Sequence, residues 1–298
     1  MFTKKRPDGT YIKNMHFFNQ IMPYLMPTRS EATIYFEQKF DVTKTLEYIR
    51  KRKKDSGDVK ITLFYIILYA AIRTIALRPK LNRFISGCRF YQRNRISFNF
   101  VAKRDLSDDG EEVNVTMSFS PFLTLEGFCR KIHEHITTLK SGSATSTEKV
   151  NSVVSLLPRP LIKLFIWGIK FLDYHNALPK SAINSLPFYS TVFFTNVGSV
   201  GIDAPLHHNF ELGNCGLFCA IGKVQKENIL KKDGTVETRD KLKLTFTYDD
   251  RITDGIYCAR ALDMVRNLVE NPEQLETPLE LTAEQLTQLG LAKAELQV

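Results

Sequence analysis

Three carboxylates and one arginine are concentrated in residues 248–255, which read Tyr-Asp-Asp-Arg-Ile-Thr-Asp-Gly. A carboxylate can accept a proton from a substrate, and burial or a second carboxylate nearby moves a carboxyl pKa upward, toward the range that such chemistry needs. A charged turn between a strand and a helix would have the same composition, with Asp254 capping the helix and Gly255 permitting a tight bend. These residues alone therefore do not decide between a proton-transfer site and a capped turn.

The elements on either side of this segment must position it. Residues 241–249 alternate as a strand does, and residues 253–270 have helical periodicity, so the carboxylates lie where a strand passes into a helix. Upstream, residues 188–201 predict a buried strand that ends in a glycine turn, and residues 215–224 predict another strand. A hairpin turn is predicted at residues 231–234 (Lys-Lys-Asp-Gly).

The rest of the chain predicts a mixture of helices and strands. We expect strands over 33–40, 89–101 and 113–119, helices over 43–50, 61–77, 124–138 and 156–172, turns or loops at 107–110 and 141–143, and a capping box at 282–285. No repeat or linker-like tract interrupts the 298 residues. The expectation is one α+β domain over 1–298, with 1–11 and 276–298 as terminal extensions.

Composition limits the partners and the location. The net charge is +9, but its densest block, residues 50–54, is typical of a solvated helix end, so we expect no nucleic-acid partner. Five cysteines, an odd number, argue for reduced thiols, and Cys215 and Cys219 lack the further ligands of a metal site. Without a long apolar run or a signal-peptide core, a cytoplasmic protein is expected and a membrane partner is unlikely.

The most apolar segment, residues 156–172, must be shielded from water by another surface. The rest of the domain, a sister subunit, a lipid surface and a long acyl substrate are all candidates, and burial within the protein or an oligomer is favoured.

Several landmarks in chain order resemble the catalytic domain of 2-oxo acid dehydrogenase acyltransferases. That family, like the more distant chloramphenicol acetyltransferases, has His-x-x-x-Asp-Gly at a strand-to-helix junction, and here Asp250 stands where the histidine is expected. Residues 41–43, 195–198 (Thr-Asn-Val-Gly) and 220–223 resemble the start of the family's first helix, its Ser-Asn-x-Gly turn and its central strand. The similarity covers roughly 12–275. The family's lipoyl and peripheral-subunit-binding domains are missing, which suggests a stand-alone member.

The resemblance implies a fold and an activity. The fold would be a chloramphenicol-acetyltransferase-like two-layer sandwich of a mixed sheet with helices, assembled as a homotrimer with each active site between subunits. The activity would be coenzyme A-linked acyl transfer, with coenzyme A or an acyl-coenzyme A as the substrate donor, a small thiol or hydroxyl acceptor, and no metal. By position, Asp250 would accept the proton and Thr195 would bind the oxyanion. Arg251, Asp254, Gly255, Asn196 and Gly198 match loop-ordering positions.

An aspartate at position 250 leaves three hypotheses open. A carboxyl group with a pKa of about 4 is a weaker base toward a thiol with a pKa of about 8.5 than an imidazole with a pKa of about 6.5 is. In the first hypothesis Asp250 is a base whose pKa has been raised. In the second, another residue is the base, and His208 of the paired histidines 207–208 is the candidate. In the third hypothesis the protein is an inactive pseudoenzyme that binds a ligand or supports assembly.

Overall fold

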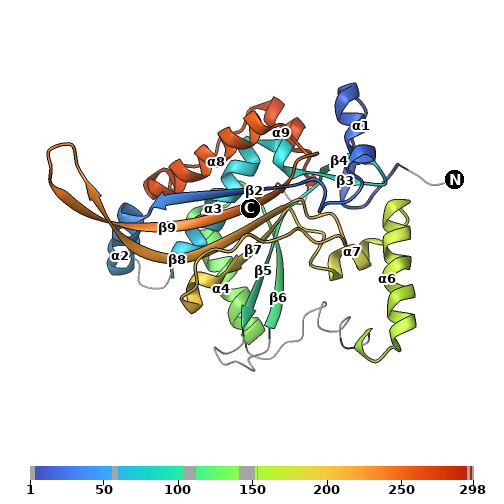
Figure 1. Ribbon diagram of the computed structural model, residues 1–298, viewed down its shortest axis with the longest axis horizontal. Helices are drawn as coiled ribbons and strands as arrows, with labels where there is room; N and C mark the ends of the chain where they lie inside the picture. The colour runs from blue at the N-terminus through green and yellow to red at the C-terminus, as the bar shows by residue number, and fades with distance from the viewer. Residues whose placement is uncertain are drawn as a thin grey trace.

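The computed structural model describes residues 4–55, 60–103, 112–140, 152, 154–293 and 296, and it contains two β-sheets (Figure 1). The larger sheet has the order β2-β9-β8-β7-β5-β6, and the smaller has the order β1-β4-β3. The strands of the larger sheet are β2 (Thr33–Asp41), β9 (Val236–Asp249), β8 (Leu217–Leu230), β7 (Val192–Asn196), β5 (Ile96–Lys103) and β6 (Glu112–Phe119). Those of the smaller sheet are β1 (Gly9–Tyr11), β4 (Arg89–Arg93) and β3 (Arg83–Ser86).

The larger sheet is mixed: β7 pairs in parallel with β5 and β8, and its other pairs are antiparallel. The α-helices are α1 (Phe17–Leu25), α2 (Thr43–Asp55), α3 (Leu63–Leu77), α4 (Leu125–Lys140), α6 (Arg159–Tyr174), α7 (Lys180–Ser185), α8 (Gly255–Glu270) and α9 (Ala283–Leu289). Short 3₁₀ helices cover Pro79–Asn82, Val197–Val200 and Pro272–Leu275. The predicted α+β class, with a mixed sheet and helices, is confirmed.

The main core lies between one face of the larger sheet and a helical layer. Helix α3 is apolar on nearly every side because it contacts α8 and α4 as well as the sheet, and Thr62 caps it by accepting a hydrogen bond from the backbone of Tyr65. Its one charged residue, Arg73, is buried and donates to the carbonyl of Thr277 at 2.6 Å. The opposite face of the sheet is covered by the loop that follows β7.

Two sequence predictions about strands are wrong. Residues 89–101 form two strands in different sheets, β4 and β5, because the chain turns at Asn94, whose backbone N–H donates to Asp8 at 3.2 Å. The alternation continues through the turn, so periodicity alone does not reveal it. Strand β7 also begins at Val192, later than the predicted 188, whereas the predicted glycine turn is present as the 3₁₀ turn Val197–Val200. The predicted turns at 107–110 and 141–143 lie outside the described residues.

Other predictions are confirmed. The turn at 231–234 closes the β8–β9 hairpin, whose far end extends well beyond the helices in Figure 1. The basic block ends α2, the capping box opens α9, and all five cysteines are free thiols. Within the segments predicted as terminal extensions, β1 pairs with β4 and the N–H of Ala292 donates to Asn94, so the described parts of both contact the small sheet or its end.

Candidate functional site

Asp250 lies in the turn that joins β9 to α8. Backbone hydrogen bonds hold this turn on both sides, because the N–H of Asp250 donates to Ala32 at 2.8 Å and the N–H of Asp249 donates to Gly216 at 2.9 Å. The sequence folds this way because β9 is flanked by β2 and β8 up to its last residue. The carboxylate therefore projects from a rigid strand end, as the resemblance implies.

The neighbouring Asp249 and Arg251 form a buried bidentate ion pair. The guanidinium donates to the two carboxylate oxygens at 2.8 and 2.7 Å, and its third nitrogen donates to the carbonyl of Met26 at 2.7 Å. Planar, charge-assisted pairs of this kind fix geometry as well as adding energy. Arg251 thus orders the turn, and both oxygens of Asp249 are occupied by it.

Tyr248 is the side chain that holds Asp250. Its hydroxyl donates to Oδ1 of the half-buried Asp250 at 2.6 Å. Burial raises the pKa of Tyr248, and the hydrogen bond to Asp250 acts in the same direction, so the phenol keeps its proton. Within the described part of the chain, no donor reaches Oδ2 of Asp250. That oxygen can accept a further hydrogen bond.

Asp254 and Gly255 begin α8. Oδ1 of Asp254 accepts a hydrogen bond from the N–H of Tyr257 at 2.8 Å, the geometry of an N-cap. Gly255 faces open space and has an ordinary backbone conformation, so the bend does not need a glycine. Asp254 is therefore a helix cap, and the backbone conformation at residue 255 does not require glycine.

The structure does not bring Thr195 to Asp250 within one chain. Thr195 pairs with Ala220, which pairs with Thr245, while Asp250 lies five residues farther along than Thr245. At the usual rise per strand residue this is about 17 Å along the sheet. Asn196 and Gly198 continue from Thr195 into the turn Val197–Val200, far from Asp250. An oxyanion site that includes Thr195 cannot form with Asp250 of the same subunit.

His207 and His208 lie over the sheet face opposite Tyr248. The ring of His207 stacks flat on Phe218, with centroids 3.9 Å apart, and its carbonyl accepts a hydrogen bond from Thr247. Tyr248 and Cys258 pack on the helical face instead. His208 is exposed and contacts His207 and Phe210. The sheet thus separates His208 from Asp250 in one subunit.

The partly buried ring of His207 predicts a pH effect. Burial lowers the pKa of His207, so the unfolded state takes up a proton more readily and stability is lost as the pH falls below about 6.5. We expect the melting temperature to fall between about pH 7.5 and 5.5, and His207→Phe to lessen that fall. His208→Phe, which changes the exposed ring, should keep the wild-type slope. Equal slopes in all three proteins would contradict the assignment.

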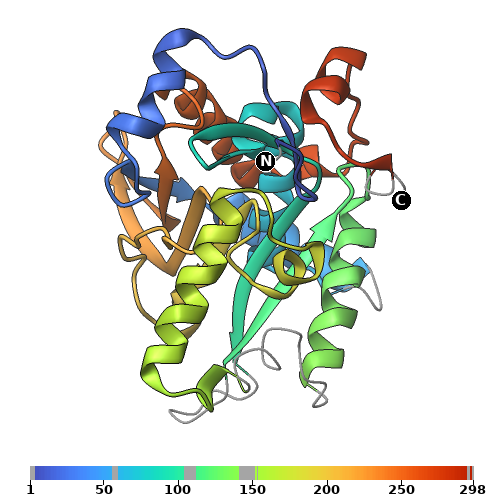
Figure 2. The same ribbon diagram turned by 90° about the vertical axis from the view of Figure 1, so that its right-hand side faces the viewer.

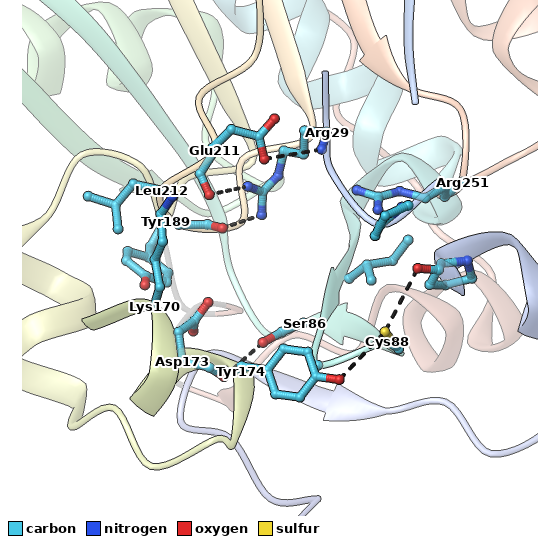
Figure 3. A pocket seen from close by; sticks show the side chains of 15 residues that line it. Arg29, Ser86, Cys88, Lys170, Asp173, Tyr174, Tyr189, Glu211, Leu212 and Arg251 are labelled. Carbon is cyan, nitrogen blue, oxygen red and sulfur yellow. Dashed lines mark hydrogen bonds between the residues drawn. The ribbon is translucent and has the colours of Figure 1, made fainter. Parts of the chain in front are cut away.

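A second candidate site is a polar cavity of about 240 Å³ bordered by α1, the β3–β4 turn, α6 and the 211–213 loop (Figure 3). Arg29 and Arg251 lie on one side, and Ser86 and Asp173 lie on the other. The hydroxyl of buried Tyr189 has no hydrogen-bond partner among the described residues. Burial raises the pKa of Tyr189, with the charge of Asp173 adding to the rise. The lining could bind a small polar molecule.

Sequence reasoning missed most of this geometry. Tyr248 belongs to the segment that was singled out, and a tyrosine two residues before a strand-end carboxylate is the signal that could have identified it. Tyr189, Arg29 and Asp173 come from three distant segments, and no spacing in the sequence connects them.

Comparisons with known proteins show similarity to acetyltransferase catalytic domains. Residues 190–277 match the family model described as 2-oxoacid dehydrogenases acyltransferase (catalytic domain). No curated protein matches the sequence. A probable dihydrolipoamide acetyltransferase from Listeria monocytogenes is similar in structure, with a TM-score of 0.55 at 15% identity, over 92% of this chain and 98% of that one. The Azotobacter vinelandii dihydrolipoamide acetyltransferase gives a TM-score of 0.57 at 14% identity, over 89% and 93% of the two chains.

These matches support an acyltransferase, and the matched segment contains both the 195–198 turn and Asp250. The predicted relationship to the catalytic domains of 2-oxoacid dehydrogenase acyltransferases is confirmed, by sequence over residues 190–277 and by fold over most of the chain.

Proposed function

We propose that the protein transfers an acyl group from coenzyme A to a thiol or hydroxyl acceptor, with Asp250 as the base. The observation that carries this proposal is the strand-end turn itself, where Tyr248 and the Asp249–Arg251 pair fix Asp250 and no described residue donates to Oδ2. A loop that had lost all chemistry would not need a carboxylate held in this way.

The reaction follows from these groups. Oδ2 of Asp250 takes the proton of the acceptor, whose oxygen or sulfur attacks the thioester carbonyl and gives a tetrahedral oxyanion. When the oxyanion collapses, the carbon–sulfur bond to coenzyme A breaks, and Asp250 returns the proton to the leaving thiolate. Tyr248 holds the carboxylate in place throughout. No metal takes part in this scheme.

We propose that the oxyanion donor comes from another copy of the chain. Thr195 is about 17 Å along the sheet from Asp250 of its own subunit, so we propose a homotrimer in which Thr195 of the partner subunit lies across the channel from Asp250. Exposed His208 could also face a neighbouring subunit. The cytoplasm stays our proposed location.

The proposal predicts a large effect of Asp250→Ala. Supplied with acyl-coenzyme A donors and thiol or alcohol acceptors, the wild type should release free coenzyme A, measured with a thiol reagent. The variant should lose about 10²-fold or more in kcat, the usual contribution of a positioned base. Asp263→Ala, which removes an exposed carboxylate from α8, is the matched control. Equal turnover by wild type and Asp250→Ala would overturn the role of Asp250.

An inactive binding or assembly protein is the second candidate. It is favoured by the carboxylate in place of histidine and by the distance between Asp250 and Thr195 within one chain. Coenzyme A that raises the melting temperature without any turnover would support this candidate, because a ligand that binds only the folded state stabilises it. Asp250→His would then test the remaining site, since gained activity requires an intact channel.

A further inference from the structure

Helix α6 presents a large apolar face that no described residue covers. Its inner stripe, with Ile169 and Asp173 buried, contacts the rest of the protein. Its outer stripe holds Leu164, Trp167 and Phe171 at helical spacing, and Leu164 and Trp167 are each 60% exposed. The rings of Trp167 and Phe171 stack with centroids 5.3 Å apart, so the outer face is a continuous apolar surface.

Helix α1 adds a second exposed apolar face on the same side of the molecule. Its exposed large side chains are Phe17, Phe18, Ile21, Tyr24 and Leu25. Figures 1 and 2 both place α1 and α6 on this side, away from the β8–β9 hairpin. Cys88 connects them, because its sulfur lies 3.8 Å from the carbonyl of Pro23 in α1 and 3.8 Å from the hydroxyl of Tyr174 in α6.

The exposed charged side chains on these two helices and their flanking residues are all positive. In residues 4–26 and 154–180 the only carboxylates are Asp8, 3% exposed, and Asp173, 9% exposed, and both bind Arg6. Exposed cations lie among the apolar groups: Lys13, Arg159, Lys163, Lys170 and Lys180. In these two segments aromatic and aliphatic side chains are interspersed with lysine and arginine and with no exposed carboxylate, although Glu31 and Glu211 lie nearby. Such a face complements a negatively charged apolar phase.

We propose that α1 and α6 form a docking surface for an anionic lipid membrane. The helices would lie along the surface, since none of those described is long and apolar enough to cross a bilayer. Lysine and arginine stems would extend to the headgroups while Trp167 and its neighbours enter the interface. A second copy of the chain is the alternative occupant, and the oligomeric state of the variants below tests it. This proposal departs from the expectation, drawn from the sequence, that the protein has no membrane partner.

The protein contains its own reporter, because Trp167 is the single tryptophan. With vesicles of phosphatidylglycerol and phosphatidylcholine at low salt, the chain should float with the vesicles, and its emission should shift to shorter wavelength. Brominated lipids should quench that emission. Pure phosphatidylcholine vesicles should bind it more weakly, and high salt should weaken binding to the anionic vesicles.

Two leucine-to-glutamate substitutions distinguish binding through this surface from nonspecific binding to vesicles. Leu164→Glu adds a charge to the outer face of α6 and should lower vesicle binding by about tenfold or more, the effect of about 1.4 kcal/mol. Leu230→Glu makes the same change at a 73% exposed leucine on the distant β8–β9 hairpin and should bind as the wild type does. Wild-type protein left unbound by anionic vesicles at low salt would overturn the proposal. So would equal losses in the two variants, or a change of oligomeric state without vesicles in Leu164→Glu alone.

Discussion

Replacing Arg6 by methionine should lower the free energy of unfolding by about 3–5 kcal/mol, because it leaves two buried carboxylates without their cation. The guanidinium donates to Asp8 at 2.9 Å, to Asp173 at 2.8 Å and to the hydroxyl of Ser86 at 2.6 Å. These contacts join the N-terminal segment, the C-terminal end of α6 and strand β3. Chemical denaturation of wild type and variant measures the loss, and α6 should become sensitive to proteolysis.

The same variant should respond differently to pH. Burial alone would raise the pKa of Asp8, but the hydrogen bonds and charge of Arg6, together with the charge of Arg93 and the hydrogen bond from Asn214, hold that pKa below its usual value. Burial raises the pKa of Asp173, even though Arg6 opposes the rise. Without Arg6 the pKa of Asp173 should rise further, so the folded state binds this proton more tightly than the unfolded state does, and stability should fall as the pH rises from about 4 toward 7.

An exposed ion pair provides the control for Arg6→Met. Lys39 and Glu227 are 2.7 Å apart, as close as the Arg6 pairs, but both lie at the surface. Lys39→Met should leave the denaturation midpoint unchanged within error, since solvent screens such pairs. If Arg6→Met were as harmless as Lys39→Met, the buried network would not be what holds α6.

The sequence predicted the elements whose pattern is local. Helix α3 was identifiable because all its faces are buried, and α8 because Asp254 caps a periodic apolar stripe. The hairpin turn at 231–234 and the capping box at Thr282 have the residue types that their geometry demands. In each case the residues that determine the structure are neighbours in the chain.

What escaped prediction depends on distant residues. The break between β4 and β5 follows from Arg93, whose buried guanidinium binds the carbonyl of Tyr189 and the side chain of Asn214, more than ninety residues away. The geometry of the candidate site also depends on residues that are distant in the chain. Its position at the end of β9 was readable, but the roughly 17 Å between Asp250 and Thr195 follows from strand register, which alternation does not specify.

Gly198→Ala should lower the free energy of unfolding by about 1–3 kcal/mol or more, the usual cost of overpacking. A Cβ at this position would lie 2.1 Å from the carbonyl oxygen of Gly222 and 2.8 Å from the backbone nitrogen of Lys223. Neither neighbour can yield easily, because the obstacle is backbone at a register shift of β8, and the N–H of Lys223 donates to Ile202 at 3.0 Å. Thermal and chemical denaturation measure the loss.

Gly255→Ala is the control for Gly198→Ala, and the pair tests two different reasons for a glycine. No atom lies within 4 Å of a Cβ at residue 255, and α8 begins there in an ordinary conformation, so alanine should preserve or slightly raise stability. If Gly255→Ala nonetheless lowers acyl transfer, the glycine leaves room for a substrate beside Asp250. If Gly198→Ala is as stable as wild type, the 195–198 turn does not pack on β8 as described, and Thr195 loses the fixed position that an oxyanion donor requires.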